Sequence, residues 1–244
     1  MKKWLSVLEL HAAMRFKRVL LVLGTMIVLQ MLSFWILGDQ SNTQTFFQVL
    51  GKVKYGWIFA LGFLAMYWAL SWPLGRNETY SYTLQRLSVT ERGSVWMKFI
   101  FNALCFVLLV IVQAGLILLM AKIFEAGKPF AGNAHGILID LEKDGMLHAL
   151  VSFSNPAQVI YRIVYILIAT ACATHMEVLF ARKQTPILSF IPPVILLLIN
   201  NIWYDEFHVA FAAAIIISVI CMITALVRCR GKKPLRDILE QQEV

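Results

Sequence analysis

Residues 99–124 read FIFNALCFVLLVIVQAGLILLMAKIF, an apolar run whose one charged side chain is Lys122. A run of this length is long enough to cross the hydrocarbon core of a bilayer as a helix. The whole chain has the same character, because its 244 residues are 59% hydrophobic and only 15% charged. That is too little charge to cover the surface of a soluble domain. The sequence therefore predicts an all-α protein of the membrane.

Five further apolar runs are separated by clusters of charged residues. Together with the first run they predict six transmembrane helices, at about 19–37, 55–74, 99–124, 159–179, 186–203 and 207–227. Backbone amides in lipid must find partners within their own segment, so each span is expected to be helical. We expect one transmembrane domain over residues 1–230 and a cytoplasmic tail over 231–244.

The residues before the first span, 3–17, mix apolar and polar positions at roughly helical spacing. Val7, Leu8 and Met14 can share one side of such a helix, with Arg15 away from it. This pattern predicts a helix that lies in the membrane interface before the chain turns inward. A polar start to the first span is the alternative, and both remain open from the sequence.

Basic residues are distributed unevenly between the two sides of the predicted domain. With a cytoplasmic N-terminus, 16 of the 22 Lys and Arg residues fall in inner segments and 6 in outer segments or span ends. Basic residues concentrate on the cytoplasmic side of membrane proteins, and an even number of spans returns the C-terminus there. We expect both termini in the cytoplasm and the chain in the plasma membrane. The net charge of +8 then faces anionic membrane lipid, and nucleic acid is not an expected partner.

Motifs for common chemistry are missing from the sequence. It has no G-x-x-x-x-G-K-[ST] phosphate loop, no G-x-S-x-G nucleophile turn and no H-E-x-x-H zinc motif. The four cysteines do not have metal-ligand spacing. We therefore expect no catalytic residue, no metal and no cofactor in this chain.

His175 and Glu177 are an acid–base pair expected inside the membrane, near the inner end of the fourth span. Residues two apart point to different sides of a helix, so they are not expected to share a ligand. Ionisable groups inside a membrane are functional hypotheses by default. In the structural alternative, Glu177 pairs with Arg182 or reaches the interface.

Two other features are candidates for a pathway. Pro192 and Pro193 lie within the fifth span and are expected to break its hydrogen-bond ladder, which is typical either of a pathway or of a packing kink. Asn200 and Asn201 belong to a polar cluster at the outer junction of the fifth and sixth spans. That cluster is either a tight external turn or the lip of a pathway.

The inner loop between the second and third spans, residues 76–99, reads RNETYSYTLQRLSVTERGSVWMKF. Thr79 is placed to cap a short helix that begins at Tyr80. Ser88 and Glu91 are spaced as a capping box, in which each side chain satisfies a backbone amide at the start of a second helix. The loop therefore predicts a helix–turn–helix on the cytoplasmic side.

Within this loop, residues 84–99 (LQRLSVTERGSVWMKF) resemble the corresponding segment of permease subunits of the ABC-2 family of ATP-binding cassette exporters. That segment commonly reads Leu-Leu-x-Pro-Val-[Ser/Thr]-[Arg/Lys] and ends in a lysine that leads into the third span. Ser88 stands at the family's proline position. Glu91 stands at its first basic position, and Arg92 follows.

The resemblance implies that residues 79–92, here called the coupling segment, dock in a groove of a separate ATPase subunit that binds ATP and Mg²⁺. It also implies a second permease subunit, identical or homologous, and export of a substrate. The apolar spans favour an amphiphilic substrate such as an antimicrobial peptide, a lipid or a drug. The residues expected at the ATPase contact are Thr79, Tyr80, Leu84, Arg86, Leu87, Ser88, Glu91 and Arg92.

Three other classes of membrane protein remain as alternatives. A membrane enzyme would use His175, Glu177 and the acidic residues of the outer loop near 125–158. A sensor or assembly subunit would have no pathway. A secondary transporter often carries charged or unwound sites near mid-membrane and an internal repeat, and we find no convincing repeat between the first three and last three spans.

Overall fold

The computed structural model describes residues 2–37, 46–53, 55–72, 91–127, 156–181, 189–194 and 208–228, and all regular structure in these ranges is helical. The predicted all-α class is confirmed for this part of the chain. The helices are α1 (Lys2–Leu37), α2 (Phe46–Val53), α3 (Tyr55–Ser71), α5 (Glu91–Gly127), α8 (Pro156–Ala181) and α10 (His208–Arg228), and residues 189–194 add a short helical segment.

Three helices contain a stretch long and apolar enough to cross a membrane. These stretches are Ser6–Ile36 in α1, Arg92–Phe124 in α5 and Ile163–Phe180 in α8. The apolar stretches Tyr55–Ser71 in α3 and Ala214–Val227 in α10 are shorter. Large apolar side chains cover the outside of the bundle, as lipid contact requires. The chain is therefore an α-helical membrane protein. The predicted fifth span, 186–203, is described only over residues 189–194.

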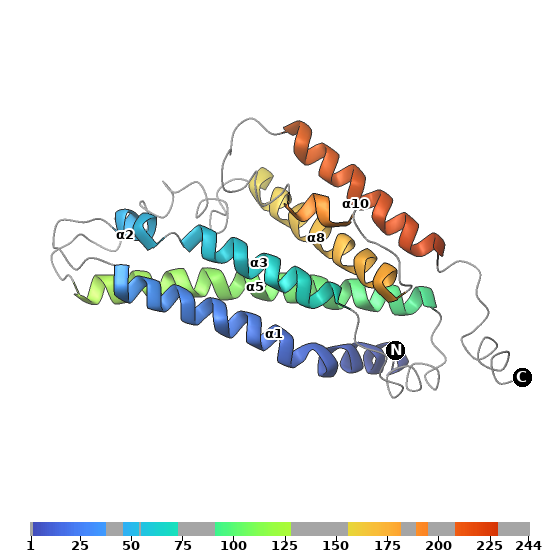
Figure 1. Ribbon diagram of the computed structural model, residues 1–244, viewed down its shortest axis with the longest axis horizontal. Coiled ribbons are helices and arrows are strands. Elements are labelled where there is room, and N and C mark those ends of the chain that lie inside the picture. Colours follow the sequence, from blue (N-terminus) through green and yellow to red (C-terminus); the bar gives the residue numbers. More distant parts are fainter. Residues whose placement is uncertain are drawn as a thin grey trace, which may run out of the picture.

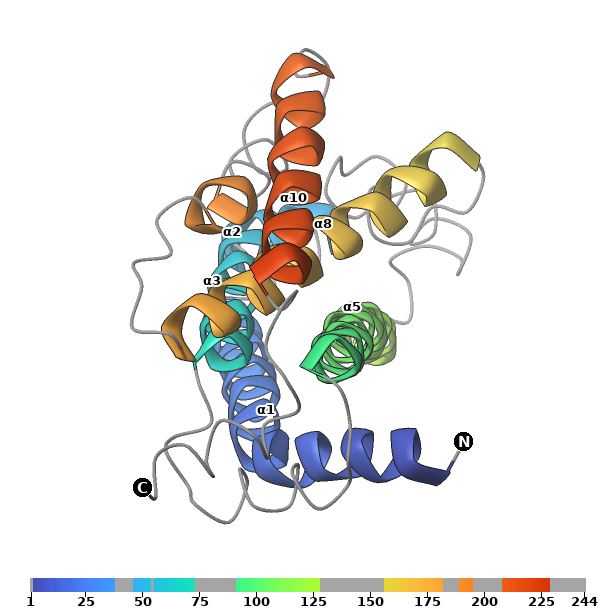
Figure 2. The ribbon, with the colours of Figure 1, turned by 90° about the vertical axis from the view of Figure 1, so that its right-hand side faces the viewer.

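The first turns of α1 run across the direction of the rest of that helix, as Figure 2 shows at the end of the bundle. The segment predicted over 3–17 is thus continuous with the first span. Val7, His11 and Arg15 recur every four residues on one face of these turns, and all three are fully buried. The prediction that Arg15 points away from the packed side is wrong, because its side chain turns into the bundle.

α1 and α5 lie side by side and run in the same direction. Arg15 Nη1 donates to Asn102 Oδ1 at 3.1 Å, and Gln30 Nε2 donates to Gln113 Oε1 at 2.8 Å. Residue numbers therefore increase in the same direction along both helices. Two parallel neighbours need a segment that crosses back between them in sequence. α3 lies against both, as Figure 1 shows. The predicted alternation of the first three spans requires this arrangement.

The main apolar cluster, here called the inner cluster, contains side chains from α1, α3, α5, α8 and α10. α8 has a central place, because residues 168–179 are buried without exception and the helix contacts α3, α5 and α10. α1 and α3 approach closely at Gly62, where an added Cβ would stand 2.8 Å from Met26 Sδ. The absence of a side chain at Gly62 therefore permits the close approach of α1 and α3.

Helix α2 lies in the stretch that the sequence analysis treated as a connection between the first two spans. Phe46, Val49, Leu50 and Val53 of α2 are all buried. They belong to a second apolar cluster, here called the outer cluster, with Phe34 of α1 and the residues Leu116, Ile117, Met120 and Ala121 of α5. The spacing of the four α2 residues (i, i+3, i+4, i+7) is the signal that would have predicted this helix.

Candidate functional site

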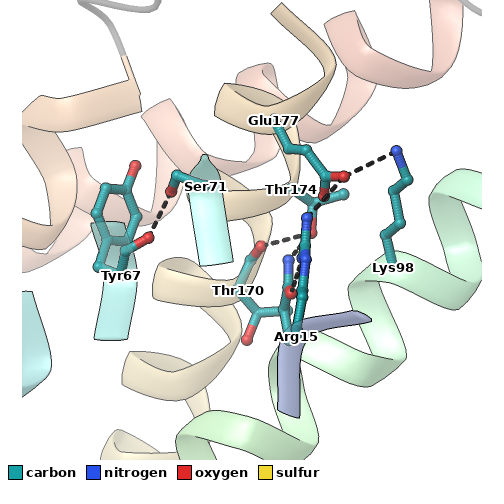
Figure 3. Close-up of polar contacts among 8 residues, drawn as sticks. Arg15, Tyr67, Ser71, Lys98, Thr170, Thr174 and Glu177 are labelled. Atoms are coloured by element: carbon teal, nitrogen blue, oxygen red, sulfur yellow. Dashed lines mark hydrogen bonds and ion pairs between the residues drawn. The ribbon is translucent and has the colours of Figure 1, made fainter. Parts of the chain in front are cut away.

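Three charged side chains from three helices meet inside the bundle (Figure 3). Arg15 Nη2 of α1 and Lys98 Nζ of α5 lie 2.7 Å and 2.9 Å from the same carboxylate oxygen, Oε1 of Glu177 in α8. The side chains of Arg15 and Glu177 are 0% and 3% exposed, and that of Lys98 is 14% exposed. We call these three residues the ion cluster.

Asn102 and Thr174 extend the ion cluster through hydrogen bonds. Asn102 Oδ1 accepts from Arg15 Nη1, and Asn102 Nδ2 donates to Thr174 Oγ1 at 3.1 Å. The Thr174 hydroxyl in turn donates to the backbone oxygen of Thr170, one turn earlier, at 2.8 Å (Figure 3). The guanidinium group is thereby fixed against both α5 and α8.

Local sequence explains why these groups can meet. The buried stretch of α8 contains Ala169, Ala171 and Ala173, whose small side chains let neighbouring helices approach. Arg15 of α1 reaches Glu177 of α8 across the bundle. Lys98 stands two helical turns after the beginning of α5 at Glu91. The ion cluster therefore joins α1 and the last turns of α8 to the first turns of α5.

The electrostatics of the ion cluster are unusual for a membrane bundle. Taking each ion out of water costs on the order of several kcal/mol, and only close opposite charges and hydrogen bonds offset this cost. Two cations share one carboxylate here, so the ion cluster carries one excess positive charge. Within the described ranges, Arg15 Nε and Glu177 Oε2 lack a hydrogen-bond partner. The hydrogen bonding of the ion cluster is therefore incomplete, and buried polar atoms without partners call for a functional explanation.

His175 belongs to a separate group with Ser189 and Thr224, here called the histidine node. Its Nδ1 lies 2.7 Å from Ser189 Oγ, and its Nε2 lies 3.0 Å from Thr224 Oγ1. The Thr224 hydroxyl also donates to the backbone oxygen of Cys221. Tyr67 OH donates to the Ser189 backbone oxygen at 2.7 Å and holds the segment 189–194 in place.

His175 and Glu177 face different partners, as their spacing of two residues predicted. Glu177 pairs with Arg15 and Lys98. Arg182, which the sequence offered as a partner of Glu177, lies outside the described residues, so that pairing stays a prediction. Pro192 and Pro193 are buried within the helical segment 189–194.

The coupling segment is described only at its end. Glu91 begins α5, and Arg92 is exposed in its first turn. The remaining predicted contact residues of the coupling segment lie outside the described ranges: Thr79, Tyr80, Leu84, Arg86, Leu87 and Ser88. The pathway candidates Asn200 and Asn201 also lie outside them. In the part of the chain that the structure describes, no three His, Cys, Asp or Glu side chains are arranged to hold a metal.

Sequence reasoning missed Arg15 and Lys98 as site residues, because basic residues near span ends were assigned to the lipid surface. A signal was present in the spacing. Thr170, Thr174 and Glu177 recur on one face of an otherwise apolar helix, and Lys98 and Asn102 stand one turn apart. Polar residues that share a face of a membrane helix are expected to point into the bundle.

Comparison of the chain with known protein families, with characterised proteins and with solved structures gives no match.

Proposed function

We propose that this chain is the permease subunit of an ATP-binding cassette exporter of the ABC-2 type that its inner loop resembles. Its substrate would be amphiphilic, such as an antimicrobial peptide, a lipid or a drug. The observation that carries the proposal is the position of the ion cluster. It ties α1 and α8 to the first turns of α5, the helix that directly continues the coupling segment.

The ion cluster supplies a physical route for coupling. Lys98 and Asn102 move with the beginning of α5, and they contact Glu177 and Arg15 directly. A pull on the coupling segment that shifts α5 must stretch these contacts or carry α1 and α8 along. The attraction between charges is strong in a low-dielectric interior, so the helices are expected to move together as rigid bodies.

The proposal includes the full topology and the assembly. The chain would cross the plasma membrane six times with both termini in the cytoplasm, and the parallel course of α1 and α5 supports the order of its first three spans. A second permease subunit would complete the pathway. A separate ATPase subunit would bind ATP and Mg²⁺ at the coupling segment, and this chain would bind no cofactor and catalyse no reaction.

The test is co-purification from native membranes, followed by mass spectrometry. An ATPase subunit is expected with the wild-type chain and not with a variant carrying Leu84→Asp, Leu87→Asp and Arg92→Glu. A control with Lys52→Glu and Lys54→Glu, in the predicted outer connection, should retain the ATPase. If no ATPase accompanies the wild-type chain, the proposal fails.

A second measurement separates docking from coupling. Glu177→Gln leaves the coupling segment intact, so the ATPase should still co-purify with the part of this variant that remains folded. ATP-dependent export by vesicles that contain this variant is expected to fall strongly, because α8 no longer follows α5. Loss of ATPase binding in this variant would mean that the ion cluster serves only the fold.

A membrane enzyme is the second candidate, and the contact between His175 and Ser189 is the observation that favours it. A serine hydroxyl within hydrogen-bond distance of a histidine nitrogen is the arrangement expected of an activated nucleophile. A fluorophosphonate probe, which labels such serines, distinguishes the two functions. Labelling that disappears in Ser189→Ala would support the enzyme, and absence of labelling is expected for the permease.

A further inference from the structure

A second buried polar contact lies between α1 and α5, apart from the ion cluster. Gln30 Nε2 donates to Gln113 Oε1 at 2.8 Å, and both residues are 0% exposed. This contact uses one half of each side-chain amide. The other halves, Gln30 Oε1 and Gln113 Nε2, have no hydrogen-bond partner among the described residues. We call Gln30 and Gln113 the amide pair.

The amide pair separates the two apolar clusters. On α1, Gln30 stands one turn after Met26 of the inner cluster and one turn before Phe34 of the outer cluster. On α5, Gln113 stands in the same way between Leu109 of the inner cluster and Ile117 of the outer cluster. A narrow polar layer thus separates the two apolar clusters between α1 and α5.

The presence of one unpaired donor and one unpaired acceptor does not depend on how the two amides are oriented. Exchanging oxygen and nitrogen in both side chains reverses the hydrogen bond and again leaves one donor and one acceptor unpaired. Leaving both unpaired in an apolar environment costs about 1–3 kcal/mol for each group. Two apolar side chains would avoid this cost, so packing alone does not explain the amide pair.

From these observations we infer that the amide pair binds a neutral group that presents one hydrogen-bond donor and one acceptor, such as a peptide backbone or a hydroxyl, within an amphiphilic substrate. The inference rests on the proposed function and specifies the substrate class. The donor of the ligand meets Gln30 Oε1, and its acceptor meets Gln113 Nε2. Apolar parts on either side of that group meet the inner and outer clusters.

The same chemistry excludes other headgroups. A phosphate or carboxylate presents only acceptors, so it would leave Gln30 Oε1 unpaired and place a charge between two apolar clusters. A quaternary ammonium group has no donor for Gln30 and no acceptor for Gln113. The amide pair is therefore matched to uncharged peptide or hydroxyl groups.

The test measures binding of matched probes to the purified full chain in lipid nanodiscs. The first pair of probes is a fluorescent N-acyl dipeptide amide and its ester analogue, in which the N–H is replaced by oxygen. The second pair is a fluorescent acyl alcohol and its methyl ether. Each pair differs by one donor, so the ratio of the two dissociation constants reports whether the protein recognises that donor.

The wild-type chain is expected to bind the donor-containing probe about tenfold more tightly in at least one pair, which corresponds to about 1.4 kcal/mol. The pair that shows the preference identifies the source as peptide or hydroxyl. Gln30→Met removes the acceptor and should abolish the preference. The double variant Gln30→Met, Gln113→Met removes both amides, so it leaves no new unpaired group and should fold while showing no preference.

Thr25→Val is the control variant, because Thr25 is an exposed residue of α1 whose hydroxyl bonds its own helix. It should retain the wild-type preference. Equal binding of both members of each pair by the wild-type chain would overturn the inference, as would a preference that persists in the double variant. Because binding is measured without an ATPase, these outcomes are independent of the co-purification that tests the proposed function.

Discussion

Glu177 of α8 lies 2.7 Å from Arg15 of α1, and neither side chain has appreciable contact with solvent. The same carboxylate oxygen also lies 2.9 Å from Lys98. One acidic residue therefore holds α1 and α5 to α8. Because the two cations differ in burial, we expect replacement of each member of the ion cluster to change the stability of the protein by a different amount.

The carboxylate is expected to be the most sensitive member of the ion cluster. Glu177→Gln leaves two cations without a charged partner, and breaking a buried ion pair costs about 3–5 kcal/mol. Thermal unfolding in detergent micelles should show a large drop in Tm. Glu9→Gln, at an exposed position of α1, is the control and should leave Tm unchanged. Equal values for Glu177→Gln and the wild-type chain would contradict the burial of the pair.

Replacement of the two cations should have unequal effects. Lys98→Met leaves a neutral pair of one cation and one anion, so a smaller loss of stability than for Glu177→Gln is expected. Arg15→Met also removes the hydrogen bond to Asn102 at a position with no solvent exposure. The loss of stability caused by Arg15→Met should therefore be several-fold larger. Denaturant titration of both variants measures the difference. A larger effect of Lys98→Met would reverse the assigned roles.

The close crossing of α1 and α3 predicts a position-specific effect of glycine replacement. Gly62→Leu forces a side chain against Met26 and should destabilise the protein by about 1–3 kcal/mol, the usual cost of overpacking. Gly115→Leu is the matched control, since nothing lies within 4 Å of a Cβ placed there. The two variants are compared by their yield of monodisperse protein and by Tm. Similar losses at both positions would argue against the observed crossing.

The parallel course of α1 and α5 predicts the sides of their flanking connections. In a background without native cysteines, Ser41→Cys should react with a membrane-impermeant maleimide in intact cells. Ser88→Cys should react only after permeabilisation, because one crossing separates the two positions in the predicted topology. Labelling of both from the same side would require a different path between α1 and α5.

Sequence alone predicted the helices well where the bilayer determines them. The run at 99–124 became α5 because lipid leaves a polar backbone no alternative to a helix. The helix α2 was missed because a short segment outside the expected spans was not examined for helical spacing. The pattern Phe46, Val49, Leu50 and Val53 was readable, and its burial follows from contact with the outer cluster.

The ion cluster could be predicted only in part. His175 and Glu177 were selected as intramembrane ionisable groups, and their divergence follows from helical geometry. Their partners could not be derived from local sequence, because Arg15 and Lys98 are distant in the chain and reach Glu177 only through the bend of α1 and the packing of α5. Long-range pairs of this kind are determined by tertiary packing, whereas spans are determined by local composition.

The arrangement of the ion cluster also has a consequence for biogenesis. α1 and α5 are synthesised before α8, so Arg15 and Lys98 reach the membrane while their shared carboxylate is still unmade. A nascent chain that ends before α8 holds two cations that must remain at the lipid headgroups. We expect both cations to become buried only after Glu177 is present, because its carboxylate is the charged partner of both. Completion of the fourth predicted span is thus the step at which ribosome-bound chains should change from protease-sensitive to protease-resistant.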